Sequence, residues 1–110
     1  MLIESDYITL RIFTPLSAVK NLQQVLADAG AGEIGNYSHC SSVYPVTGYF
    51  LPKSGATPTI GSVGKLEVVE EMVIETICKK NDVDRIYTAI KQAHPYEEPV
   101  IDMFPRYILS

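Results

Sequence analysis

The longest alternating segment of the chain, residues 66 to 79, constrains the fold most, because its period of two is typical of a strand. One face of that strand would carry Val68, Glu70, Met72, Ile74, Thr76 and Cys78, and the other Val69, Glu71, Val73, Glu75, Ile77 and Lys79. The first face is the more apolar at its centre, so we expect it to point toward the core. The second is half apolar, which suggests contact with another subunit.

A strand followed by a helix is predicted at the N-terminal end. Residues Tyr7–Phe13 alternate, with Ile8, Leu10 and Ile12 on one face. We expect Thr14 to cap the following helix and Pro15 to occupy its first position, where a missing N–H costs nothing. An apolar stripe follows at helical spacing, and Gly30 is expected to end the helix. The stripe consists of Val19, Leu22, Leu26 and Ala29.

The segment from residue 31 to 65 is rich in Gly, Ser, Thr and Pro. We expect extended chain over Tyr37–Tyr44 and Gly48–Leu51, a turn at Pro45–Thr47, and a loop at Ala56–Gly61. The aromatic residues here would line a ligand cleft or a subunit interface, or pack against the sheet. They are Tyr37, Tyr44, Tyr49 and Phe50.

A second helix and a last strand complete the pattern. Asn81 or Asp82 is expected to cap the helix, and the pair His94-Pro95 to end it, since proline disfavours a helical residue before it. Its predicted apolar stripe is Val83, Ile86, Tyr87, Ile90 and Ala93. Two prolines, Pro99 and Pro105, make the strand Val100–Tyr107 an expected edge strand.

The predicted order is therefore β-α-β-β-α-β. This is the ferredoxin-like α+β arrangement, in which two helices cover one face of an antiparallel sheet.

Length and charge limit the classes of function. A chain of 110 residues, 46% hydrophobic and 20% charged, predicts a single globular domain over residues 1–110. Its net charge of −4 disfavours nucleic acid as a partner. We find no signal peptide and no apolar run near the roughly 18–20 residues of a membrane span. Two isolated cysteines, Cys40 and Cys78, favour a reducing compartment, so we expect a cytoplasmic protein without membrane contact.

The glycine-rich stretch Gly30–Gly35 contains the letters G-x-G-x-x-G. A dinucleotide fingerprint leaves a strand and opens a helix, whereas this stretch leaves a predicted helix and leads into extended chain. The pattern therefore disfavours a nucleotide site. A backbone nest for a small anion remains an alternative to a simple tight turn at Gly32 and Gly35.

Histidines and carboxylates supply the other candidate site. His39, His94 and Glu97 together would suit a divalent metal, the only cofactor that the sequence suggests. Against that, no single element spaces them as ligands, and His39 could instead bond the backbone while His94 caps helix carbonyls. No nucleophile elbow or triad spacing exists around Ser38 and Ser41, so we predict no catalytic residues.

Three motifs, taken together, carry a resemblance to a known family. They are Gly30-Ala-Gly-Glu-Ile-Gly-Asn-Tyr-Ser-His-Cys-Ser41, Gly61-Ser-Val-Gly-Lys-Leu-Glu67 and His94-Pro-Tyr-Glu-Glu-Pro99. In this order and spacing the chain resembles, over essentially its whole length, the small domain inserted into proteins of the YqfO / NGG-interacting-factor-three family. The ending also resembles that of CutA-type divalent-cation-tolerance proteins.

The resemblance implies a PII/CutA-like, ferredoxin-like fold and a tendency to form homo-oligomers, trimers or dimers. It implies ligand-binding positions at Gly32, Gly35, Asn36, Ser38, His39, His94, Tyr96, Glu97 and Glu98. Full-length relatives carry a two-metal core and are described as cyclohydrolase-like or metal-dependent hydrolases, but that core has no counterpart in this sequence.

Three hypotheses follow. The first is a non-enzymatic regulatory module that binds a small anion, a metal or a protein. The second is a metal-assisted hydrolase that uses His39, His94 and Glu97. The third is an interaction module for a separately encoded core protein.

Overall fold

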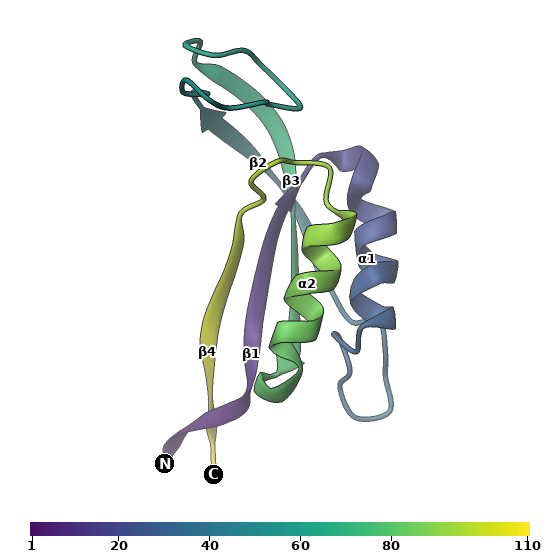
Figure 1. The fold of residues 1–110 in the computed structure, drawn as a ribbon. Coiled ribbons are helices and arrows are strands. Elements are labelled where there is room, and N and C mark those ends of the chain that lie inside the picture. The colour runs from purple at the N-terminus through teal and green to yellow at the C-terminus, as the bar shows by residue number, and fades with distance from the viewer.

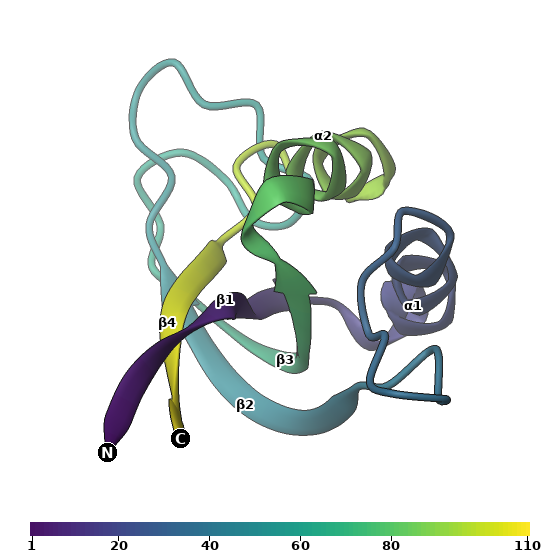
Figure 2. The same ribbon diagram turned by 90° about the horizontal axis from the view of Figure 1, so that it is seen from below.

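A computed structural model of the chain describes residues 1–110 and shows one antiparallel sheet with two helices on the same face (Figures 1 and 2). The strands are β1 (Leu2–Thr14), β2 (Ser42–Phe50), β3 (Glu67–Lys79) and β4 (Ile101–Leu109), in the sheet order β2-β3-β1-β4. The helices are α1 (Val19–Asp28) and α2 (Val83–Ala93), each preceded by a short 3-10 turn. The predicted ferredoxin-like fold is therefore confirmed.

The hydrophobic core lies between the helices and the central strands. Ile74 and Cys78 of β3 are buried there beside Leu10 and Ile12 of β1, so the face of β3 predicted to point inward does so. Nearer the start of β3 the same face is open, with Val68 55% exposed, because the hairpin of β2 and β3 projects beyond the helices (Figure 1). The helices contribute Val19, Leu22, Leu26, Ile86 and Ile90.

Both helices begin differently from the prediction. Thr14 does not cap α1; it is the buried last residue of β1, because Pro15 is extended (ψ 152°) and a 3-10 turn follows it. Asp82 is the N-cap residue of α2, yet its carboxylate makes no capping bond and pairs with Arg85 at 3.4 Å. Tyr87 was predicted in the apolar stripe of α2, but its side chain is 39% exposed.

Strand β2 runs without a break through the residues predicted as a turn. Pro45 lies opposite Met72 and Thr47 opposite Glu70 in one continuous ladder with β3. β2 pairs only with β3, so it is an edge strand, where a missing N–H on the outer side breaks no bond. The strand predicted from Tyr37 begins only at Ser42.

β4 is the other edge strand, as its prolines predict, since it pairs only with β1. The molecule is elongated, measuring 50 × 28 × 24 Å. The two termini lie side by side at the end opposite the projecting hairpin, and the amide of Ser110 donates to the carbonyl of Met1 (Figure 1). No helix has both the length and the apolar character needed to cross a bilayer.

The glycine-rich stretch is a turn between α1 and β2, which confirms that it does not open a helix. Gly30, Gly32 and Gly35 all have positive φ, and Gly30 follows the helix C-cap. Gly32 is also sterically required, because a Cβ there would lie 2.7 Å from the carbonyl oxygen of Cys40. That carbonyl accepts the Thr76 hydroxyl at 2.6 Å, which fastens the turn to β3.

Substitutions at two of these glycines should therefore separate steric clash from backbone strain. Gly35 has positive φ, but a Cβ there meets nothing within 4 Å. We expect Gly35→Ala to lower the free energy of unfolding by about 1 kcal/mol through strain alone. Gly32→Ala should cost at least ~2 kcal/mol, since the backbone at Cys40 must move as well. Urea denaturation measures both values, and equal costs would contradict the close approach.

Candidate functional site

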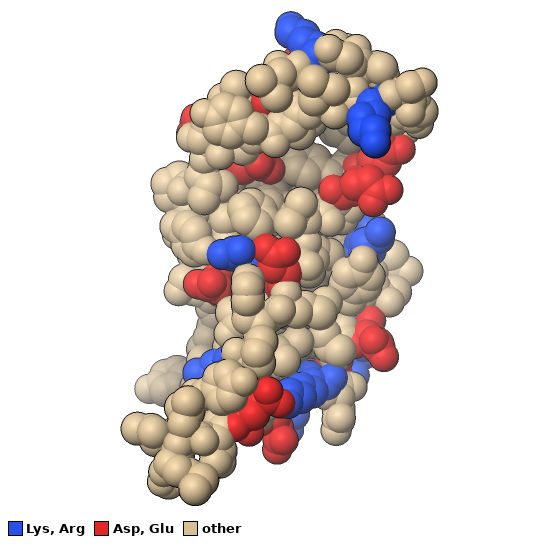
Figure 3. Space-filling model, turned by 90° about the vertical axis from the view of Figure 1, so that its left-hand side faces the viewer, with Lys and Arg blue, Asp and Glu red and all other residues tan.

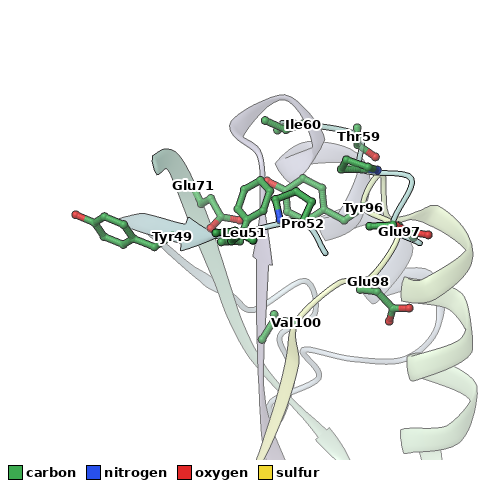
Figure 4. A pocket seen from close by; sticks show the side chains of 13 residues that line it. Tyr49, Leu51, Pro52, Thr59, Ile60, Glu71, Tyr96, Glu97, Glu98 and Val100 are labelled. Carbon is green, nitrogen blue, oxygen red and sulfur yellow. The ribbon is translucent and has the colours of Figure 1, made fainter. Parts of the chain in front are cut away.

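A cavity with mostly apolar walls lies where β1 has ended but β2 and β3 continue. Thr14 opposite Met72 is the last pair between β1 and β3, so Glu71 is the first β3 residue without a partner on that side. The connection from α2 to β4 crosses this corner and joins the sheet where the amide of Phe13 donates to Val100. The cavity has a volume of about 360 Å³ and is lined by Tyr49, Phe50, Leu51, Pro52, Ala56, Pro58, Thr59, Ile60, Glu71, Tyr96, Glu97, Glu98 and Val100 (Figure 4).

His94 fixes the α2–β4 connection to the end of β1. Its Nδ1 accepts the backbone N–H of Tyr96 at 3.0 Å, so the ring proton is on Nε2, which donates to the carbonyl oxygen of Phe13 at 2.7 Å. The ring is buried, at 8% exposure. His94 therefore does not cap the carbonyls of its own helix, as one alternative expected, but bonds the neighbouring strand.

Burial lowers the pKa of His94, although the bond to the Phe13 carbonyl and the charge of Glu71 oppose that shift. The histidine is accordingly neutral in the folded protein at neutral pH. Both ring nitrogens are occupied by hydrogen bonds within the chain, so neither has a free lone pair for a metal.

Glu97 fastens the β2–β3 loop over the cavity. Its two carboxylate oxygens accept the backbone N–H of Thr57 at 3.0 Å and the hydroxyl of the same residue at 2.9 Å. Thr59 adds a hydroxyl bond to the carbonyl of Pro95 at 2.9 Å. Residues 40 positions apart in sequence thus hold the loop against the connection, and this loop forms one wall of the cavity.

Tyr96 and Glu71 meet at the centre of the cavity (Figure 4). Burial raises the pKa of the Tyr96 phenol to about 12, and the charge of Glu71 and a hydrogen bond to its carboxylate add to that shift. The phenol therefore stays neutral at physiological pH. The Glu71 carboxylate lies over Gly48 of β2, and a Cβ at that glycine would collide with it.

The residues predicted around the glycine stretch lie at the other end of the molecule. Asn36, Ser38 and His39 are exposed in the α1–β2 turn, and the Ser38 hydroxyl lies 2.8 Å from Nδ1 of His39. The amides of Gly30, Ala31 and Gly32 already donate to protein carbonyls, so they are not free to bind an anion.

The structure brings together Tyr96, Glu97 and Glu98 but separates His39 from them. α1 and α2 run antiparallel, so the turn after α1 and the connection after α2 lie at opposite ends of the sheet (Figure 1). No group of three His, Cys, Asp or Glu side chains is arranged to hold a metal ion. The three predicted metal ligands thus do not converge within one subunit.

The central carboxylate of the cavity is one that the sequence did not single out. Glu71 was predicted only as one residue of the half-apolar face of its strand, because its position in an alternating strand gives no sign of β1 ending beside it. One weak signal existed: glycine inside a strand, as at Gly48, often marks a close approach by another group.

Comparisons with known proteins align most of the chain with one segment of longer proteins. No family model matches the chain. A GTP cyclohydrolase 1 type 2 homolog from Halalkalibacterium halodurans is 43% identical over 94 residues, covering 86% of this chain and 25% of that protein. The Bacillus subtilis protein of the same name is 40% identical over 96 residues, covering 87% and 26%. The chain therefore spans about a quarter of the length of these curated relatives.

Solved structures agree with the resemblance to the inserted domain and with the resemblance to CutA-type proteins. A Bacillus cereus protein related to NIF3 superposes with a TM-score of 0.80 at 38% identity, over 96% of this chain and 26% of that one. The periplasmic divalent cation tolerance protein CutA from Archaeoglobus fulgidus gives a TM-score of 0.68 at 18% identity, over 91% of this chain and 83% of that one. At that identity the second match shows the fold alone.

The neutral state of His94 predicts how stability depends on pH. Its folded pKa is lowered, so the unfolded chain binds the proton more readily, and stability is lost as pH falls through about 6.5 toward the folded value. We expect the free energy of unfolding to fall between pH 7 and 5, as measured by urea denaturation. The variant His94→Gln should flatten this slope, whereas His39→Gln, in the exposed turn, should keep it. An unchanged slope in His94→Gln would assign the effect to other groups.

The bonds from Thr57 to Glu97 predict a specific change in dynamics. Glu97→Ala should speed hydrogen exchange at the Thr57 amide by about tenfold or more, because that N–H loses its acceptor. The neighbouring Glu98→Ala serves as the control, since no hydrogen bond holds Glu98 to the loop. Equal exchange in the two variants, measured by NMR, would show that Glu97 does not fasten the loop.

Proposed function

The chain belongs to the YqfO / NGG-interacting-factor-three family, and we propose that it is a non-catalytic binding module that assembles with copies of itself. In this proposal the cavity beside Tyr96, Glu97 and Glu98 is its ligand site. Assembly would produce a dimer or a trimer.

The observation that carries self-assembly is the uncovered face of the sheet. Both helices pack on one side, and no helix covers the other (Figure 2). The open face carries apolar side chains of all four strands: Phe13, Tyr44, Val46, Ile77 and Phe104. The edge strand β4 has further exposed apolar side chains toward its end, among them Tyr107, Ile108 and Leu109. Apolar side chains gathered on a sheet face and along its edge strand are typical of an interface.

One ion pair on that face lies beside an aromatic ring. The guanidinium of Arg11 contacts the Asp102 carboxylate at 3.1 Å and lies 4.9 Å from the centre of the Phe104 ring. Arginine stacked on an aromatic ring and paired to a carboxylate is a common anchor of protein interfaces.

The motif residues themselves favour binding over catalysis. Both ring nitrogens of His94 make hydrogen bonds within the fold, and both carboxylate oxygens of Glu97 accept hydrogen bonds from the β2–β3 loop. A general base or a metal ligand needs a free lone pair directed at a substrate or an ion. These two side chains of the third motif thus hold in place the segments that surround the cavity.

Disrupting the open face should break the assembly. We expect an oligomer at micromolar concentration by light scattering, and a shift to monomer in Phe104→Glu, because a charge would be buried against apolar side chains. Tyr87→Glu is a matched control, since Tyr87 on α2 has the same exposed fraction, 39%, on the helix side. A monomeric wild-type protein, or equal dissociation of both variants, would count against assembly through this face.

A further inference from the structure

The charged groups that line the cavity are all acidic. Glu71, Glu97 and Glu98 contribute carboxylates, and no Lys, Arg or His lines it. Figure 3 shows the hollow beneath the projecting hairpin, with acidic side chains and a basic side chain at its margin. The four ion pairs of the chain involve Arg11, Lys65, Lys80 and Arg85, and none of them includes a lining residue.

The three carboxylates differ in what they can still bind. Glu97 is satisfied by Thr57, and Glu98 points away from the cavity centre (Figure 4). Glu71 lies at the centre beside the neutral phenol of Tyr96, and it takes part in none of the four ion pairs. A cationic ligand would therefore find a carboxylate there that no Lys or Arg of the chain already pairs with.

The rest of the lining is apolar or aromatic. Phe50, Leu51, Pro52, Ile60 and Val100 surround the carboxylate, together with the ring of Tyr96. Such walls suit the carbon body of a small molecule, and an aromatic ring favours an adjacent ammonium group.

We propose that this cavity binds a small organic cation, a primary amine on a compact apolar body, with its ammonium group at Glu71 and its body against Phe50, Pro52 and Tyr96. The inference rests on the proposed ligand site. A bare metal ion is disfavoured, because no three ligating side chains converge. A small anion is disfavoured by the carboxylates.

Two probes of equal shape and opposite charge test the proposal. Phenethylamine and phenylacetate would each be titrated to millimolar concentration into the isotope-labelled protein, with amide shifts followed by NMR. We expect the amine to shift the amides around Glu71 and Tyr96, and phenylacetate to leave them unchanged. In Glu71→Gln the affinity for the amine should fall by about tenfold or more, which corresponds to ~1.4 kcal/mol.

Glu70→Gln is the matched control, because Glu70 precedes Glu71 in β3 but does not line the cavity. It should bind the amine as the wild type does. Binding of phenylacetate in place of the amine would overturn the cationic class and leave the ligand site standing. If neither probe binds, the inference and the proposed ligand site are both overturned. The assembly would still be tested by light scattering. An amine affinity equal in both Glu variants would remove Glu71 from the site.

Discussion

The buried ring of His94 is the interaction on which the functional end of this molecule depends. Its two hydrogen bonds join the carbonyl of Phe13, near the end of β1, to the backbone N–H of Tyr96 in the α2–β4 connection. It adds to the bonds of Val100, Glu97 and Pro95 that also hold the connection, and Pro95 and Pro99 remove two of the amides that could otherwise bond the sheet. The ring thus helps to position Tyr96 and Glu97, which line the cavity.

A second constraint is the unequal length of the strands. β1 and β3 each have 13 residues, but their register is shifted, so β3 and its partner β2 extend past the end of β1. Because β1 ends before β2 and β3 do, a space remains beside the two longer strands, and the α2–β4 connection fills that space only in part. The loop after β2 closes the remaining side through Thr57 and Thr59. The cavity is therefore a consequence of strand register, completed by three short polar contacts.

The sequence predicted the parts of this fold that depend on periodicity. The inward face of β3, the edge position of β4 and the reversed polarity of the glycine stretch all followed from local patterns. It failed where a tertiary neighbour decides the outcome. Pro45 was taken for a turn, but an edge strand tolerates a proline; Thr14 was taken for a helix cap, but its strand runs through it. Glu71 was overlooked because only the end of β1, a strand far away in sequence, makes its position special.

The same reasoning explains what the last motif of the resemblance does in the structure. The segment His94-Pro-Tyr-Glu-Glu-Pro99 has the residue types of an active site, yet its histidine and first glutamate are engaged in holding strand, loop and connection together. A motif whose side chains hold the fold together indicates that fold, and it does not indicate which ligand the fold binds. Specificity then belongs to the residues that the motif positions or encloses. In the proposed ligand site they are the aromatic and aliphatic lining and the carboxylate of Glu71, which lies outside all three motifs.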